Sequence, residues 1–302
     1  MKMTKLKIFS AHFFTILFWG SAFPGIRHAL SAYSPEHLSL LRLLIGSSIL
    51  LIVSLFVKTP IPRLKDLPVI MLLGFLAFTV YHIGLNIGEQ TVSAGIASLL
   101  VSMTPIFTAI LAFAFHKVKL PIHGWFGALV SFIGVIVITI GGGNGGTALH
   151  IGIMFILIAS IAECFYFVFQ NRYLERYGFF PFTMYTIWAG TISMLIFSPG
   201  LFAEIAKAPF DATLTVVYLG IFPTVVPYFA LAYVTSKTGA TEATSSLYLT
   251  PAISYFIAWI FLGETPSIYQ IGGSMIVLTG VFITNIKTVK RKKGKLTSIA
   301  EI

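Results

Sequence analysis

Apolar residues run through the chain in long stretches that are separated only by short polar connections. A helix needs about 20 mostly apolar residues to cross the hydrocarbon core of a membrane. Ten stretches meet this requirement, roughly 9–31, 37–57, 67–88, 93–115, 121–141, 151–171, 180–198, 213–235, 241–262 and 266–286. Transmembrane strands would show alternating segments of about ten residues, and the sequence has no such pattern. We therefore predict an all-α integral membrane protein with ten transmembrane helices.

The first stretch follows three lysines, as the apolar part of a secretory signal peptide does. We expect it to remain as a helix, because it is long, contains Trp19 and Pro24, and has no small-x-small cleavage site followed by a soluble chain.

Composition agrees with a membrane protein. Charged residues make up 10% of the 302 residues, whereas about 25% is usual in a soluble domain. This excludes a soluble enzyme, a disordered chain and a disulfide scaffold. The one cysteine, Cys164, lies in an apolar run and can form neither an internal disulfide nor a cysteine zinc site.

Basic residues give the chain a formal net charge of +10 and an orientation. All of them except Arg27, Arg42 and Lys207 fall on one side of the predicted membrane. The positive-inside rule places that side, and with it both termini, in the cytoplasm. Residues 287–302 then form a basic cytoplasmic tail. Contact with anionic lipid is the preferred interpretation of this tail, ahead of nucleic-acid binding.

The chain contains an internal repeat, from 9–141 to 151–286. The residue pairs at one constant offset include Leu73 and Leu219, Thr104 and Thr250, Pro105 and Pro251, Gly127 and Gly273, and Gly134 and Gly280. Because each copy holds five helices, the second copy must enter the membrane from the opposite side. Inverted repeats of this kind face each other around a cavity and give alternating access by rocking. We therefore favour transport over a duplication that merely doubled a packing unit.

Several motifs resemble those of EamA-type transporters of the drug/metabolite transporter superfamily. They are Trp19-Gly20-Ser21-Ala22-Phe23-Pro24, Pro35 with Arg42, Ser93-Ala94-Gly95-Ile96-Ala97-Ser98-Leu99-Leu100, Thr104-Pro105, Leu249-Thr250-Pro251, Leu262-Gly263-Glu264 and the segment 273–280. The resemblance covers nearly the whole chain. It implies ten helices in two five-helix repeats, and the export or import of amino acids, other metabolites or drugs across the bacterial inner membrane. Val118 is a departure, since the family usually has an acidic residue there, like Glu264 in the second copy.

Two titratable side chains inside predicted spans are candidates for proton coupling. Glu163 lies midway along the sixth span, where an apolar environment favours the neutral carboxyl and permits proton exchange near neutral pH. His82 is the other candidate, and it shares a helix face with Asn86. For Glu163, His82 and Asn86 alike, the alternative is an ordinary hydrogen bond between helices.

Arg42, near the start of the second span, has two interpretations. It binds an anion, or it is a structural arginine that snorkels to the outer interface or pairs with a helix C-terminus. We prefer the structural one.

Other polar and aromatic side chains are expected to line the cavity and grip an amphipathic solute. The complete set of predicted substrate-binding residues is Trp19, Ser21, Tyr81, His82, Asn86, Ser98, Ser102, Glu163, Tyr166, Gln170, Tyr228, Thr244 and Tyr248. The alternative for each is packing between helices.

Prolines and glycines inside the spans have structural interpretations. The predicted helix kinks or gates are Pro24, Pro105, Pro227 and Pro251. The small residues Gly127, Ser131 and Gly134 let helices approach closely. They are assigned to packing between helices, or between the protomers of a homodimer. The Gly-rich run around Asn144 is expected to be a hinge between the repeats.

The preferred function is secondary transport of a small metabolite, an amino acid or a related amphipathic compound, with export favoured over uptake. A nucleotide-sugar or phosphate-ester carrier is the alternative, although Arg42 is the one basic residue inside a span. An integral-membrane enzyme on lipid-linked substrates, or a scaffold, is less favoured. No catalytic residue, metal site or cofactor is expected, because the sequence shows no suitable motif.

Overall fold

The computed structural model describes residues 2–57, 59–117, 122–141 and 146–285. The expectations for Val118, for most of the Gly-rich run and for the basic tail therefore lie outside the described residues.

The described chain is built from helices. The first half contains α1 (Lys2–Ala29), α2 (Pro35–Phe56), η1 (Leu64–Asp66), α3 (Leu67–Gly74), the π-helical η2 (Phe75–Val80), α4 (Tyr81–Glu89), α5 (Ala94–Val101), α6 (Thr104–His116) and α7 (Ile122–Gly141). The second half contains α8 (Gly146–Phe169), α9 (Asn171–Tyr177), α10 (Phe179–Met194), η4 (Leu195–Phe197), α11 (Leu201–Lys207), α12 (Phe210–Thr238), α13 (Ala240–Thr244), η5 (Ser245–Leu249), α14 (Thr250–Leu262) and α15 (Ile268–Asn285).

The ten predicted spans correspond to apolar helices in the structure. Within the described residues, seven helical stretches are long and apolar enough to cross a membrane, and three shorter apolar helices lie at the remaining predicted spans. Large apolar side chains such as Phe14, Phe132, Trp259 and Phe282 cover the outside of the bundle, as expected for helices that face lipid. The prediction of an all-α membrane protein is confirmed.

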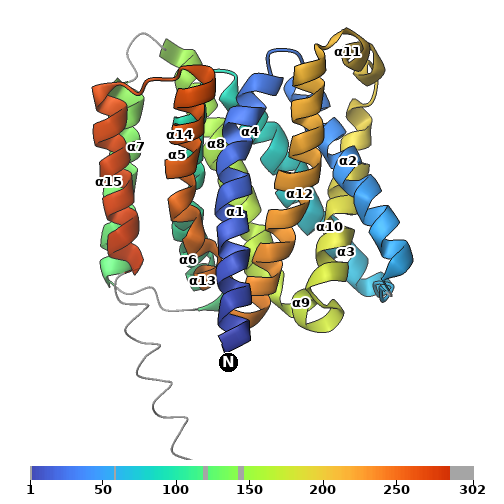
Figure 1. Ribbon diagram of the computed structural model, residues 1–302. Coiled ribbons are helices and arrows are strands. Elements are labelled where there is room, and N and C mark those ends of the chain that lie inside the picture. The colour runs from blue at the N-terminus through green and yellow to red at the C-terminus, as the bar shows by residue number, and fades with distance from the viewer. Residues whose placement is uncertain (1, 58, 118–121, 142–145, 286–302) are drawn as a thin grey trace, which may run out of the picture.

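The two halves have opposite orientations. In Figure 1, α1 begins at the lower end of the bundle and α15 ends there, whereas α8 begins at the upper end. Successive long helices then alternate in direction in both halves. The fold is therefore two inverted five-helix repeats, as predicted.

The fourth helix of each repeat is interrupted at the same place. α5 ends at Val101 and α6 begins at Thr104, and in the second half the 3-10 segment η5 leads into α14 at Thr250. Pro105 and Pro251 lie in the first turn of the new helices, where the missing N–H has no helical partner to lose. By contrast, α1 and α12 continue through Pro24 and Pro227.

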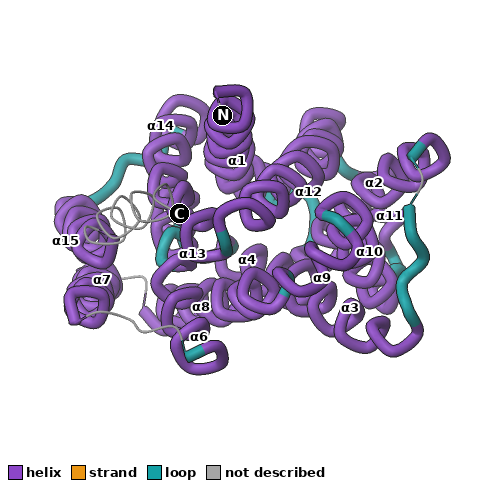
Figure 2. The backbone as a smooth tube through the Cα atoms, turned by 90° about the horizontal axis from the view of Figure 1, so that it is seen from below, coloured by secondary structure: helices purple, strands orange, loops and turns teal. Residues whose placement is uncertain are grey.

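The fifth helices of the two repeats, α7 and α15, pair at one edge of the bundle (Figure 2). Ser131 Oγ donates a hydrogen bond to Val277 O at 3.1 Å. A Cβ atom on Gly134 would lie 2.7 Å from Gly273 O, so only glycine permits this approach without a shift of the helices. The glycine pattern therefore serves packing between helices of one chain, and a homodimer stays a prediction.

Candidate functional site

Two prolines in α12 create the centre of the site by freeing two backbone carbonyls. Pro223 and Pro227 have no N–H group, so the carbonyls of Leu219 and Pro223 lose their helical donors. Thr224 Oγ1 donates to Leu219 O at 2.8 Å, and the indole Nε1 of Trp19 donates to Pro223 O at 3.1 Å. Trp19 thereby ties α1 of the first repeat to α12 of the second.

Arg42 of α2 lies inside the bundle against the same turn of α12. Its Nε donates to Thr224 Oγ1 at 3.0 Å, and the residue is only 3% exposed. The expectation that Arg42 snorkels to the outer interface is therefore wrong, whereas its choice between a structural and an anion-binding role is not decided by this contact. The contact with Thr224, whose hydroxyl is positioned by the Pro223 break, holds the guanidinium between the two repeats.

Glu163 of α8 is hydrogen-bonded to Tyr228 of α12. The Tyr228 hydroxyl donates to Glu163 Oε1 at 2.8 Å. Glu163 is 1% exposed, and its Oε2 has no hydrogen-bond partner among the described residues. The Tyr228 ring also contacts Trp19 edge-on, with a centroid distance of 5.1 Å. Tyr228 thus separates Glu163 from the cavity that Trp19 borders.

A π-helical segment precedes the histidine of the site. In η2 the register of backbone hydrogen bonds changes, and the His82 Nδ1–H group donates to Phe78 O at 2.8 Å. The other ring nitrogen, Nε2, is buried without a hydrogen-bond partner among the described residues. π-helical turns occur often at functional sites, and the sequence carries no signal that predicts this one.

Two small cavities lie at this centre and share Trp19, Phe23 and Tyr81 in their walls. Side chains that line only the first are Ala22, Ile26, Arg42, His82, Leu85 and Tyr228. Side chains that line only the second are Ser98, Val101, Ser102, Leu247 and Thr250. Each has a volume of about 10 Å³, which is room for about one water molecule. The structure is therefore closed around its centre, and a metabolite can enter only after the repeats move apart.

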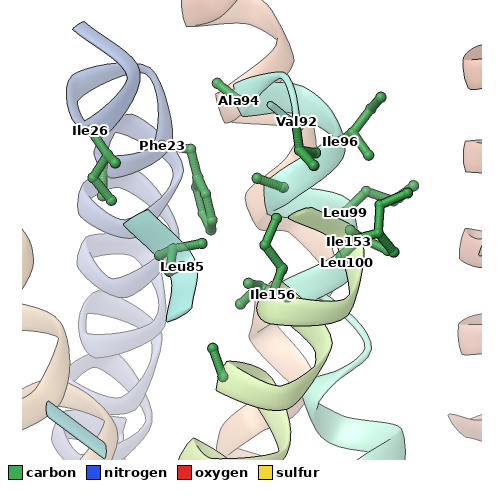
Figure 3. Packing of buried hydrophobic residues seen from close by; sticks show 14 of the residues in the cluster. Phe23, Ile26, Leu85, Val92, Ala94, Ile96, Leu99, Leu100, Ile153 and Ile156 are labelled. Atoms are coloured by element: carbon green, nitrogen blue, oxygen red, sulfur yellow. The ribbon is translucent and has the colours of Figure 1, made fainter. Parts of the chain in front are cut away.

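Apolar packing closes the bundle above the first cavity. In Figure 3, Phe23 and Ile26 project from α1 and Leu85 from α4. All three belong to one buried cluster with residues of α5 and α8, and each is at most 2% exposed. These side chains of α1 and α4 must move apart before the cavity can open toward the upper end.

The predicted substrate-binding residues divide into three groups. Those that line the two cavities are Trp19, Tyr81, His82, Ser98, Ser102 and Tyr228. Glu163 and Tyr166 contact the far side of Tyr228, with 6.3 Å between the two tyrosine rings.

The third group makes contacts away from the cavities. Ser21 bonds Tyr218, Asn86 donates to Ser39, Gln170 donates to Thr235, Thr244 donates to Ala240 O, and Tyr248 borders a separate groove near α14 and α15. Ser21 and Asn86 share helices with lining residues but face other neighbours, whereas Gln170 and Thr244 belong to elements that contribute no lining residue.

The site also contains residues that were not predicted for it. Phe23 lines both cavities, Arg42 lines the first and Thr250 lines the second. A buried carboxyl outside the cavities was also missed. Glu89 is 0% exposed, and its carboxyl oxygens have no hydrogen-bond partner among the described residues. It lies just past the predicted end of the third span. A search for every carboxyl at a span boundary, not only within a span, would have found it.

Charged groups connect the repeats at the upper end. Glu264, which follows α14, accepts a hydrogen bond from the backbone N–H of Ala94 at 3.1 Å and lies 3.8 Å from Arg27 Nε. It therefore caps α5 of the first repeat from the second repeat. Arg27 in turn donates to the backbone carbonyl of Glu89.

A second pair of contacts has a mirror arrangement at the two ends. At the lower end, Asp66 at the start of α3 accepts hydrogen bonds from Arg176 at 2.6 Å and from the Tyr177 hydroxyl at 2.5 Å. Hydrogen bonding to Asp66 raises the pKa of the Arg176 guanidinium. At the upper end, Asp211 at the start of α12 lies 3.2 Å from His28 Nε2. At the lower end, the third helix of the first repeat contacts α9, which follows the first helix of the second repeat. At the upper end, the third helix of the second repeat contacts the end of α1, the first helix of the first repeat.

Breaking the lower contact is expected to open that end. In Asp66→Asn, the labelling rate of the native Cys164 by a small thiol reagent should rise, because the variant loses the charge that pairs with Arg176 at this end. Cys164 is buried in α8 and bonded to Thr104 O, so it reacts only when the bundle opens. Glu175→Gln, an exposed change on α9, is the control. Equal rates in Asp66→Asn and wild type would contradict this role.

A sequence model of the EamA-like transporter family matches residues 7–140 and 150–286. The chain is 50% identical to "Uncharacterized transporter YdfC" of Bacillus subtilis (strain 168), with coverage of 98% of this chain and 97% of that protein. It is 33% identical to "Probable terminal-alkyne amino-acid exporter" of Streptantibioticus cattleyicolor, with coverage of 94% and 95%.

More distant similarities agree with these. "Uncharacterized inner membrane transporter YedA" of Escherichia coli (strain K12) is 27% identical, with coverage of 92% of this chain and 91% of that protein. A solved crystal structure superposes with a TM-score of 0.62 at 17% identity, with coverage of 91% and 95%. At this identity the superposition concerns the fold alone.

Proposed function

Because the chain belongs to the EamA-like transporter family, we propose that it is a secondary active transporter that exports a small amphipathic metabolite, an amino acid or a related compound, by alternating access. The protein is a multi-pass membrane transporter and not an enzyme. The observation that carries the proposal is the closed centre between two inverted repeats. The centre contains Arg42, Trp19 and Tyr228. At each end of the bundle, contacts between charged groups hold the two repeats together.

The proposed orientation rests on charge. Among the described connections, the lower end carries Arg63, Lys65, Lys117, Arg172, Arg176 and Lys237, whereas the upper end carries Arg27 and Lys207. The positive-inside rule favours a cytoplasmic lower end and cytoplasmic termini. The relative from Escherichia coli is named an inner membrane transporter, which supports the bacterial cell membrane as the location.

The proposed substrate class rests on the cavity walls. Aromatic rings and a few hydroxyl groups suit a solute that is partly apolar and partly polar. The relative that is named an amino-acid exporter supports both the amino-acid class and the outward direction. A nucleotide-sugar or phosphate-ester carrier is less favoured, because Arg42 is the one cationic side chain among the described residues that line the two cavities.

Transport by the purified protein tests the proposal. Proteoliposomes preloaded with an unlabelled amino acid are expected to accumulate the same labelled amino acid by counterflow, for at least one member of a panel of apolar amino acids. Liposomes without protein provide the background. Transport of glucose 6-phosphate in the absence of any amino-acid transport would favour the phosphate-ester alternative instead.

A further inference from the structure

The Arg42 guanidinium is a buried cation without a carboxylate partner. Its Nε bonds the neutral Thr224 hydroxyl. None of the salt bridges among the described residues includes Arg42. Placing an arginine within a span costs about 2.5–3.5 kcal/mol on insertion scales, and buried charges are normally paired. The missing partner therefore requires an explanation.

The surroundings of Arg42 have the character of a binding site. Arg42 lines a cavity with His82, Tyr81 and Tyr228, and each of these side chains carries a polar group. Phe23 and Leu85 line the same cavity and add apolar surface to it. One cation, several neutral polar groups and an apolar wall together match a solute with one negative charge and an apolar body.

We propose that Arg42 is the residue that recognises the solute, by pairing its terminal NH2 groups with a carboxylate. This inference rests on the proposed transport function and identifies the solute as an amphipathic carboxylate, such as an amino acid with an apolar side chain. A guanidinium presents a planar fork of donors that fits the two oxygens of a carboxylate. Thr224 accepts the hydrogen bond from Nε, so the two terminal NH2 groups are left to bind the ligand.

The charge of the site selects a carboxylate over a phosphate. A phosphate ester carries nearly two negative charges and requires more than one cation or a metal. The lining of the two cavities supplies only Arg42. A carboxylate neutralises the guanidinium one to one, so its binding compensates the charge of Arg42.

Matched pairs of ligands provide the test. The thermal unfolding temperature of the purified full-length protein in detergent is measured with L-leucine and leucinamide, with L-phenylalanine and phenylalaninamide, and with inorganic phosphate. Each amide differs from its acid by the loss of the carboxylate charge. We expect at least one acid to raise the unfolding temperature of the wild type, while its amide and phosphate have a much smaller effect.

Variants of Arg42 sharpen the test. Arg42→Gln is expected to weaken binding of the acid by about tenfold or more, as the loss of a charge-assisted pair predicts. Arg42→Lys keeps the positive charge but lacks the planar set of donors, so it should retain part of the affinity for the acid. The exposed Lys207→Gln removes a positive charge away from the cavity and should bind as wild type does. A cooperative unfolding transition of ligand-free Arg42→Gln, at a temperature close to that of the wild type, would show that this variant is folded.

Three results would overturn the inference. They are equal stabilisation by acid and amide, no stabilisation by either acid, and unchanged acid binding in Arg42→Gln. If proteoliposomes carry an amide as well as its acid, transport stands and carboxylate recognition falls. Loss of acid counterflow in Arg42→Gln, with acid counterflow retained in Lys207→Gln, would support both.

Discussion

Glu163→Gln is expected to remove the response of transport to a pH gradient while the exchange of solute continues. Glutamine has nearly the same size and keeps an oxygen that accepts the hydrogen bond from Tyr228. It cannot take up or release a proton. Uptake driven by an imposed pH gradient should therefore fall by about tenfold or more, which corresponds to about 1.4 kcal/mol, whereas counterflow without a gradient should stay close to the wild-type rate.

The same measurement separates the two candidates for proton coupling. His82→Gln serves as the comparison, because His82 lines the cavity directly and Glu163 lies behind Tyr228. A pH response that persists in Glu163→Gln but disappears in His82→Gln would assign the coupling to His82. A response that persists in both variants would contradict proton coupling at either residue.

Sequence patterns predicted the helices because each span depends mainly on a local property. Length and apolar character alone located all ten, and the offset between Thr104-Pro105 and Thr250-Pro251 related the two repeats before any contact was known. The inverted arrangement followed from the odd number of helices in each copy. None of these steps requires knowledge of how a helix is rotated in the bundle.

The composition of the site depends on that rotation and was predicted less completely. His82 and Asn86 share a helix face, yet His82 lines the cavity while Asn86 donates to Ser39 of α2. The position of Arg42 depends on a contact with Thr224 that is distant in sequence. Nothing in the amino-acid sequence of η2 indicates its change in hydrogen-bond register either. Long-range contacts of this kind can be seen only in the folded structure.

The proline breaks explain why the site lies where it does. A transmembrane helix that lacks a backbone hydrogen bond must satisfy the freed carbonyl inside the protein. In α12 the indole of Trp19 and the hydroxyl of Thr224 do so. Trp19 also lines the cavity beside Arg42 and Tyr228, and Thr224 accepts the hydrogen bond from Arg42. Local backbone chemistry in the second repeat thus positions polar groups from the first.

Gly273→Ala is expected to destabilise the protein, whereas the same change at the adjacent Gly272 is not. A Cβ on Gly273 would lie 2.5 Å from Ile138 Cγ1 and 2.8 Å from the carbonyl oxygen of Gly134, so α7 and α15 must separate. Overpacking of this kind costs about 1–3 kcal/mol. A Cβ on Gly272 meets nothing within 4 Å, and alanine there gains about 0.5–1 kcal/mol of helix propensity. Thermal unfolding of the two purified variants measures the difference, and equal unfolding temperatures would show that the α7–α15 contact is looser than described.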